Sequence, residues 1–402
     1  MNSVKKLFCR SFQAVLRLAL PFLPYRDPKV LNCVQDVPGC LKEKKIERVL
    51  IVTDGFLHIS GMLEPLKNTL KDNGIQYTIY DEVTPNPTVL NVELARERYI
   101  RYGCQGLIGF GGGSAIDCAK AVGARIARPH LSIPRMKGIL KIWLPIPFLI
   151  AIPTTAGTGS ETTLATVITD HKTSHKFPIN DFPLIPRVAV LDPEMTRSLP
   201  PHMTSTTGMD ALTHAIEAYI GNSTTAQTRA AALEAARLIA ENLEQAYRDG
   251  NDMTARANML QAAFLAGGAF SKSYVGYCHA VAHSLGGQYH IPHGLANAVL
   301  LPYVLEAYGD CAHAKCKDIA IAMHLAEDST PATEATRQLI AEIRRMNADM
   351  NIPSKLPGIR VCDIPKLARY ADKEANPLYP VPKLMDAKAL EQFYYDVMEQ
   401  TP

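Results

Sequence analysis

Residues 106–117 read GLIGFGGGSAID, an apolar run that passes into three consecutive glycines and then into a helical pattern. The apolar residues 106–110 predict a buried strand, and the helix is expected to continue to Ala127. Glycines let the backbone approach a phosphate closely, and the free N–H groups at the start of a helix attract its negative charge. This corner therefore predicts a phosphate site, although a tight structural turn would leave the same pattern.

The residues on either side of this corner repeat the alternation of strand and helix. Helical periodicity runs through residues 63–73 and 89–102. Besides the strand at 106–110, buried strands are predicted at residues 49–53, 77–80, 148–152 and 187–191. Such alternation is typical of a parallel sheet with helices on both faces. We therefore expect an α/β, Rossmann-like domain in the N-terminal half.

The second half of the chain has a different pattern, with no convincing strand after about Pro200. Helices are predicted at residues 206–220, 225–248, 253–270, 279–285, 296–308, 333–347 and 387–399. Gly286 and Gly287 are expected to end the fourth of them. We predict an α/β domain over residues 1–196 and an all-helical (all-α) domain over residues 197–402. A cleft between two domains is a preferred place for an active site.

The composition is that of an ordinary globular enzyme, with 47% hydrophobic and 20% charged residues among 402. The formal charge is only +3, so no global field would recruit nucleic acid or acidic lipid. The nine cysteines form no CxxC pair, and their odd number argues against a disulfide framework. We therefore expect reduced thiols and a cytoplasmic location.

Residues 4–26, VKKLFCRSFQAVLRLALPFLPYR, combine basic and apolar side chains. Arg17 interrupts the apolar run, and Pro21 and Pro24 would end a helix soon afterwards, so the apolar stretches are too short to span a bilayer. No small-x-small cleavage pattern of a signal peptide follows. Three interpretations of this N-terminal extension, residues 1–26, remain open: an amphipathic helix that packs on the body or on a partner subunit, a surface membrane anchor, or a targeting segment.

Two further features favour a bound dinucleotide. Residues 153–160, PTTAGTGS, follow a predicted strand and supply hydroxyl and N–H groups suited to phosphates and a nicotinamide carboxamide. Asp54 ends the first strand, where an acid can bond to a ribose hydroxyl and would repel a 2′-phosphate, which favours NAD over NADP. The first loop reads G-x-G-x-x-S rather than the G-x-G-x-x-G fingerprint, and Asp54 could also be an exposed turn residue.

Histidines and one aspartate in the helical half suggest a metal site. Asp210 and His214 lie four residues apart in GMDALTHAIEA and share a helix face, which a buried hydrogen bond or joint metal ligation would explain equally well. Residues 276–294, GYCHAVAHSLGGQYHIPHG, hold four of the twelve histidines, and His293 can return toward the face that carries His279. Three imidazoles and one carboxylate form a ligand set that both Fe(II) and Zn(II) accept.

Together these motifs resemble the iron-containing (group III) alcohol dehydrogenases over nearly the whole chain. The resemblance rests on GGGSAIDCAKA, PTTAGTGSE, GMDALTHAIEAYI and GYCHAVAHSLGGQYHIPHGLANA. It implies a dehydroquinate synthase-like fold with an N-terminal NAD-binding domain and a helical metal-binding domain. The implied reaction is reversible hydride transfer between NAD(H) and a small alcohol, aldehyde or ketone.

The resemblance also implies roles for individual residues. It makes Asp210, His214, His279 and His293 the metal ligands and places His283 near the nicotinamide, where it would carry the proton. Around the NAD it places Asp54, Gly111, Gly112, Gly113, Ser114, Asp117, Thr154, Thr155, Thr158 and Lys176. A homodimer or larger assembly is expected.

The chain departs from better-known members of this family in its longer basic N-terminus and in the basic stretch at residues 128–143. These departures leave the substrate open. One alternative is a hydroxyacid–oxoacid transhydrogenase that holds NAD tightly. Another is a lyase of the dehydroquinate synthase type, against which the set of one aspartate and three histidines argues.

Overall fold

The computed structural model describes residues 1–170 and 175–399, which form two compact units. One unit is Pro24–Leu199, and the other combines Met1–Leu23 with the chain from Pro200 onward. The sequence pattern places the N-terminal extension, residues 1–26, in the α/β domain. Its first 23 residues instead belong to the helical unit, because the polar side chains of the first helix bond to that unit.

Six parallel strands form the sheet of the α/β unit. Their order across the sheet is β1 (Lys29–Leu31), β9 (Val188–Val190), β6 (Phe148–Pro153), β4 (Gly106–Gly111), β2 (Arg48–Val52) and β3 (Gln76–Tyr80). The five predicted strands are confirmed. The sequence did not predict β1, because three residues at the edge of a sheet are too few to show a pattern.

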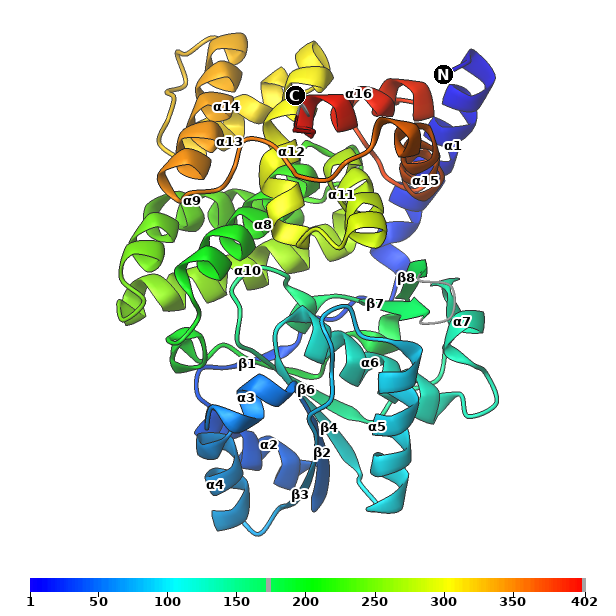
Figure 1. Ribbon diagram of the computed structural model, residues 1–402, viewed down its shortest axis with the longest axis vertical. Helices are drawn as coiled ribbons and strands as arrows, with labels where there is room; N and C mark the ends of the chain where they lie inside the picture. The colour runs from blue at the N-terminus through cyan, green and yellow to red at the C-terminus, as the bar shows by residue number, and fades with distance from the viewer. Residues whose placement is uncertain (171–174, 400–402) are drawn as a thin grey trace. The chain divides into compact units, whose positions relative to one another are not determined.

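Alternate residues of the central strands face opposite helix layers, as the two-residue period of a strand requires. Leu50 and Val52 of β2 share a core with α5 (Val89–Arg101) and α6 (Gly113–Ala127). Val49 and Ile51 share the other core with α2 (Val37–Glu43) and α4 (Glu64–Asp72). Figure 1 shows the two layers on either side of the sheet. Burial on both faces explains why the strands are continuous apolar runs.

A second, smaller sheet in the same unit was not predicted. It consists of β5 (Gly138–Ile139), β8 (His175–Asn180) and β7 (Ala165–Asp170), with β7 antiparallel to β8. The basic stretch at residues 128–143 contains α7 (Ile133–Met136) and β5. Thr166 is buried in β7, where its hydroxyl donates to the carbonyl of Asp117 at 2.7 Å. A polar residue at a buried position hides the apolar period by which a strand is predicted.

The second unit is built from helices, as predicted. They are α1 (Ser3–Ala19), α8 (Pro201–Ile220), α9 (Ala226–Arg248), α10 (Met253–Ser273), α11 (Tyr277–Tyr289), α12 (His293–Tyr308), α13 (His313–Ala322), α14 (Ala332–Asp349), α15 (Ile364–Ala375) and α16 (Ala387–Val397). Helix α8 packs against α9, α10 and α12, and every residue from Gly208 to Ile220 is buried. It therefore forms the core on which the other helices assemble.

The prediction that Gly286 and Gly287 end a helix is wrong. Helix α11 continues through both glycines to Tyr289, and His290 ends it in the left-handed conformation with φ 58°. A glycine inside a helix costs only about 1 kcal/mol relative to alanine, and the packing of α11 against α12 and α15 exceeds that cost.

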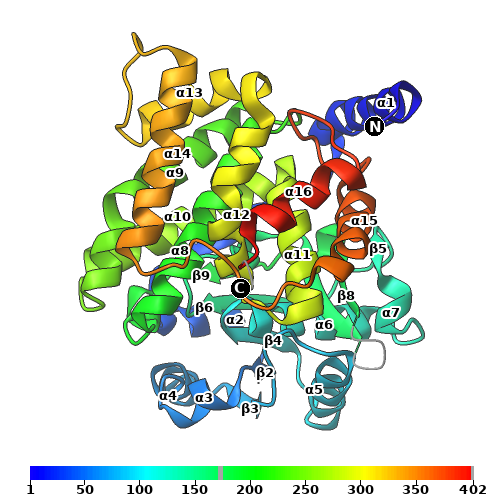
Figure 2. The same cartoon turned by 45° about the horizontal axis from the view of Figure 1, so that its top comes forward.

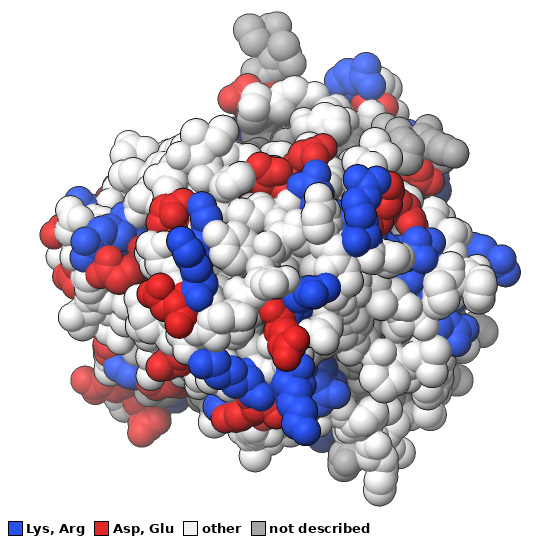
Figure 3. Space-filling model, turned by 90° about the horizontal axis from the view of Figure 1, so that it is seen from below, with Lys and Arg blue, Asp and Glu red and all other residues white. Residues whose placement is uncertain are grey.

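The surface and the helices bear on possible partners. Among the described residues, no helix combines the length and the apolar character needed to cross a membrane. Basic and acidic side chains lie beside one another on the face drawn in Figure 3, in keeping with the small net charge. A face with such interspersed charges does not favour a polyanion such as nucleic acid.

Candidate metal centre and dinucleotide site

Three helices bring four potential ligands together in the helical unit. Asp210 and His214 lie one turn apart on α8, His279 lies in the first turn of α11, and His293 is the first residue of α12. One ligand atom from each residue lies within 4.8 Å of the others. The structure thus brings together all four residues to which the sequence analysis gave this role.

Two glycines permit the close approach of these helices. A Cβ atom on Gly294 would lie 2.3 Å from the carbonyl oxygen of Thr206, so only glycine lets α12 begin against α8. A Cβ atom on Gly276, just before α11, would lie 2.5 Å from Oε1 of Glu217. Both residues therefore set the distance between the backbone segments that carry the ligands.

The ligand atoms surround a small volume. Oδ1 of Asp210 lies 3.8 Å from Nε2 of His279 and 3.6 Å from Nε2 of His293. The ring of His214 stacks on that of His279, with centroids 4.4 Å apart, and on its other side on Phe270 at 4.2 Å. Asp210, His214 and His279 are buried, whereas His293 is partly exposed. A ligand entering this site would meet His293 before the buried members.

The chemistry of His279 tests whether the residues fit a cation. Burial lowers the pKa of His279 well below its ordinary value, so the imidazole is neutral, which is the ligating form. Its Nε2 atom is buried and has no hydrogen-bond partner among the described residues. An unsatisfied buried polar atom costs about 1–3 kcal/mol, which a coordinated cation would offset. The four residues therefore fit a divalent transition metal with one carboxylate and three imidazole ligands.

Glu217 orients the imidazole of His279 through the ring nitrogen that faces away from the cluster. Its carboxylate accepts the Nδ1–H of His279 at 2.6 Å and the backbone N–H groups of Gly276 and Cys278, both at 2.8 Å. Burial raises the pKa of Glu217 to about 7, against the opposing effect of these donors. A carboxylate on the far nitrogen of a ligating histidine fixes its tautomer and its direction. The sequence analysis gave Glu217 no role, although it lies three residues after His214 on the same helix face.

Asn297 holds the carboxylate of Asp210. Its Nδ2 donates to Oδ1 of Asp210 at 2.6 Å and lies 3.2 Å from Nε2 of His293. Asn297 is fully buried on α12, one turn after His293. The sequence analysis missed this residue too, and its spacing of four from His293 was the available signal.

His283 lies beside the cluster without belonging to it. Its ring stacks on that of His293 with centroids 5.0 Å apart, and its Nδ1 lies 2.7 Å from Oε1 of Glu374. The hydroxyl of Tyr379 donates to the same oxygen at 2.9 Å. The His283 side chain is 28% exposed, so it can exchange a proton with solvent. Nothing in the sequence indicated Glu374, which is 91 residues from its partner.

In the α/β unit, Asp54 lies next to the glycine corner. Asp54 follows β2 and caps α3 (Gly55–Ile59), accepting the N–H of Leu57 on Oδ1 at 3.0 Å. Its Oδ2 lies 3.8 Å from the position of a Cβ on Gly111. Gly111 has φ +145°, and a Cβ there would lie 2.8 Å from that of Ala115, so this turn requires glycine. Gly112, Gly113 and Ser114 follow at the start of α6 and are only partly buried.

The second loop adjoins the first. The N–H of Thr154 donates to the carbonyl of Gly111 at 3.0 Å. A Cβ on Gly112 would lie 3.3 Å from Thr155, and one on Gly113 would lie 3.0 Å from Thr158. The hydroxyl of Thr155 is buried and has no hydrogen-bond partner among the described residues. The two predicted loops thus form one surface at the carboxyl ends of β4 and β6.

Asp117 and Lys176 have structural partners. Asp117 accepts the hydroxyl of Ser160 at 2.6 Å and the N–H of Val167 at 2.8 Å, so its carboxylate ties the second loop and β7 to α6. Nζ of Lys176, on β8, donates to Oδ1 of Asn86 at 2.9 Å. We therefore expect Asp117 to hold the loop at residues 153–160 in position beside the glycine corner.

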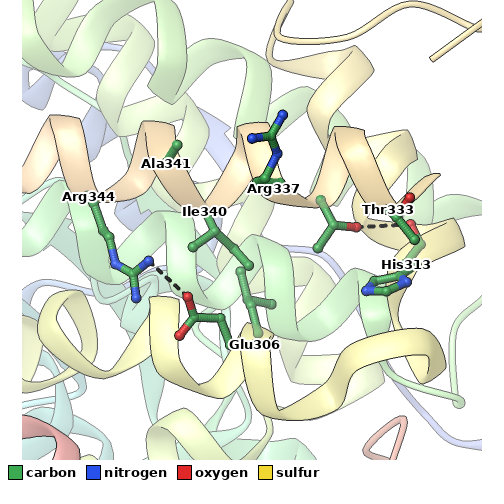
Figure 4. A pocket seen from close by; sticks show the side chains of 9 residues that line it. Glu306, His313, Thr333, Arg337, Ile340, Ala341 and Arg344 are labelled. Atoms are coloured by element: carbon green, nitrogen blue, oxygen red, sulfur yellow. Dashed lines mark hydrogen bonds and ion pairs between the residues drawn. The ribbon is translucent and has the colours of Figure 1, made fainter. Parts of the chain in front are cut away.

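A separate pocket of about 570 Å³ lies among α12, α13 and α14. Figure 4 shows that its side chains include an ion pair between Arg344 and Glu306, whose atoms lie 2.8 Å apart. None of the four potential metal ligands lines this pocket. We assign it no part in the chemistry of the cluster.

Comparison with known proteins agrees with this geometry. Residues 31–193 match the family model of iron-containing alcohol dehydrogenase, and residues 204–398 match that of the C-terminal part of the Fe-containing alcohol dehydrogenase family. The chain belongs to this family.

Individual relatives cover most of the chain. 1,3-Propanediol dehydrogenase of Citrobacter freundii is 39% identical over 89% of this chain and 92% of its own. NAD-dependent methanol dehydrogenase of Bacillus methanolicus is 35% identical over 87% and 92%. A crystal structure of 1,3-propanediol oxidoreductase superimposes with a TM-score of 0.89 at 36% identity, covering 93% of this chain and 99% of the other.

Proposed function

We propose that this chain is an NAD-dependent alcohol dehydrogenase that interconverts a short-chain alcohol and its carbonyl compound with Fe(II), or Zn(II) in its place, at the Asp210–His214–His279–His293 cluster. The observation that carries the proposal is the cluster itself, with the buried Nε2 of His279 aimed into it. One carboxylate and three neutral imidazoles suit either cation. Membership of the family supports iron.

The chain's own residues would orient the reactants and move the proton. A cation held by Asp210, His214, His279 and His293 would supply a Lewis acid, and a nicotinamide held at the two loops would supply the hydride acceptor. Glu217 and Asn297 hold His279 and Asp210 in direction. His283 takes the proton at Nε2, because its Nδ1 is bonded to Glu374.

Preference for NAD rests on the surface formed by the two glycine and threonine loops. Asp54 presents its carboxylate beside Gly111, where an acid bonds to a ribose hydroxyl and repels a 2′-phosphate. The relative named an NAD-dependent methanol dehydrogenase supports this preference. The partly buried N–H groups at the start of α6 suit the pyrophosphate.

The relatives also support small, primary substrates, since two of those named above act on methanol and on 1,3-propanediol. All nine cysteines are free thiols, which supports a reducing compartment such as the cytoplasm. We also propose that two or more copies of the chain assemble, and light scattering on the purified protein measures the mass of the assembly directly.

The proposal is tested by loading the protein anaerobically with Fe(II) or Zn(II) and following NADH at its absorbance maximum with methanol, ethanol and 1,3-propanediol. Net NADH formation is expected without any second carbonyl acceptor. His279→Ala should abolish both bound metal and NADH formation. His290→Asn, an exposed control that keeps a residue suited to the left-handed conformation, should retain both. Carbonyl product that forms from the alcohol only when an oxoacid is added, with no net NADH, or full activity of H279A, would overturn the proposal.

A further inference from the structure

The first helix is attached to the protein through its polar side chains. Cys9 and Gln13 are its buried residues, and they lie one turn apart. Nζ of Lys5 donates to Oδ2 of Asp372 at 2.8 Å, and Nε2 of Gln13 donates to the carbonyl of Tyr379 at 2.7 Å. The guanidinium of Arg10 donates to the carbonyls of Val381 and Pro382, both at 2.8 Å. We call these the anchoring bonds of the helix. Figures 1 and 2 both draw α1 beside α15, which carries Asp372.

Several apolar side chains of the same helix point away from these bonds. Five large apolar residues are between 59% and 77% exposed, and they are Val4, Leu7, Phe8, Val15 and Leu18. Phe22, just after the helix, is 87% exposed. Spacings of three, four and seven residues place the five on one face, opposite Cys9 and Gln13. An amphipathic helix normally buries its apolar face, so this reversed orientation leaves an apolar face open to a partner outside the subunit's core.

The charged side chains of this N-terminal segment are all basic. No acidic residue precedes Asp27, and residues 1–26 hold Lys5, Lys6, Arg10, Arg17 and Arg26. Lys5 and Arg10 are occupied by the anchoring bonds, whereas no ion pair involves Lys6 or Arg17 among the described residues. Beside the helix the charges are mixed: Arg229 and Arg17 add to the effect of burial in lowering the pKa of Lys315, whereas Asp318 opposes it, and the N-terminal amino group pairs with Asp386.

We propose that α1 and Phe22 form a docking surface for an anionic lipid membrane, in which the helix lies flat and inserts its apolar face about 5–10 Å into the headgroup region. Basic residues beside an exposed apolar helix face match the negative surface of such a membrane. A second copy of the chain is the less suitable occupant. Two copies of this helix would bring their basic residues together without any acidic residue on either helix to pair with them.

Cosedimentation of the full-length, metal-loaded protein with vesicles tests the proposal. Binding is expected to phosphatidylcholine vesicles that contain about 30 mol% phosphatidylglycerol and to fall strongly when salt rises from about 0.1 M to about 0.5 M. The double variant L7E/L18E should bind at least about tenfold less, because it places two charges in the inserted face. The matched control L90E/I100E changes two exposed apolar residues of α5 in the same way and should bind like the unchanged protein.

Light scattering and alcohol oxidation complete the experiment. L7E/L18E should keep the mass and the activity of the unchanged protein, since both positions are exposed and distant in sequence from every candidate ligand. Absence of binding to anionic vesicles would overturn the proposal, as would equal binding by L7E/L18E. A fall in oligomeric mass in L7E/L18E would also overturn it and would assign the face to a second copy.

Discussion

Nδ1 of His279 lies 2.6 Å from Oε2 of Glu217, and the same carboxylate accepts the two backbone N–H groups that begin α11. One buried side chain on α8 therefore sets both where α11 starts and where the Nε2 of His279 points. Glycine at position 276 is part of the same arrangement, since a side chain there would collide with the Glu217 carboxylate. The orientation of the ligand thus depends on contacts within the core as much as on the ligand itself.

Glu217→Gln is expected to weaken metal binding by about 10- to 100-fold, because an amide holds the His279 imidazole in direction less strongly than a carboxylate. Dialysis against graded concentrations of a chelator, followed by metal analysis, measures the change. Glu241→Gln on α9, a partly exposed glutamate that pairs with Arg237, is the matched control and should leave metal affinity unchanged. Equal affinities of E217Q and the unchanged protein would contradict the role given to this carboxylate.

His283→Ala is expected to retain the metal and to lower kcat by about 100-fold, because it removes the proton carrier but no ligand. Glu374→Gln should lower kcat less, about tenfold, while KM stays nearly constant, since Glu374 only orients the imidazole. Metal analysis and steady-state kinetics on the same preparations separate these effects. Loss of metal from H283A would show that His283 is itself a ligand.

The sequence predicted the larger sheet well because its central strands are buried on both faces. Residues 49–52 have no polar member and no exposed position, so their pattern has only one interpretation. The small sheet escaped prediction because the burial of Thr166 depends on a hydrogen bond to Asp117, a partner 49 residues away. The end of α11 was misplaced because the free energy that two glycines cost a helix is smaller than the stabilisation that the helix gains from packing.

The candidate site was likewise predictable only in part. The four potential ligands lie in short motifs, and the structure brings them together. Of the residues that support these ligands, only some could be predicted from the sequence. Glu217 and Asn297 have helical spacing from a ligand, whereas Glu374 reaches His283 from α15, which no local pattern can reveal. The structure also shows that the Asp117 carboxylate is occupied by Ser160 and Val167.

Asp54→Ser is expected to raise the use of NADP relative to NAD by at least about tenfold in kcat/KM, because the charge that repels a 2′-phosphate is lost. Serine retains an oxygen that can cap α3, so the change removes the charge without removing the cap. Steady-state rates with both cofactors at several concentrations measure the preference. If the ratio stays the same, Asp54 acts only as the helix cap.

Lys120→Met is expected to lower the free energy of unfolding of the α/β unit by roughly 3 kcal/mol. Lys120 is fully buried, and its Nζ donates to the carbonyls of Thr163 and Ala165 and to the hydroxyl of Thr163, at 2.8–2.9 Å. Methionine fills a similar volume but leaves these acceptors unsatisfied. Urea denaturation followed by circular dichroism measures the loss, and the exposed Lys71→Met is the control.

The difference in unfolding free energy between the unchanged protein and K120M should increase as pH rises. Burial lowers the pKa of Lys120 from 10.5 to about 8, against the opposing charges of Asp117 and Glu161. Between these two values the unfolded chain binds the proton of Lys120 more strongly than the folded chain does, so the contribution of Lys120 to stability increases with pH. The gap in unfolding free energy between the unchanged protein and K120M should therefore be wider at about pH 10 than at about pH 8. A gap that narrows over this interval would mean that the folded protein keeps Lys120 charged throughout, held by its three acceptors.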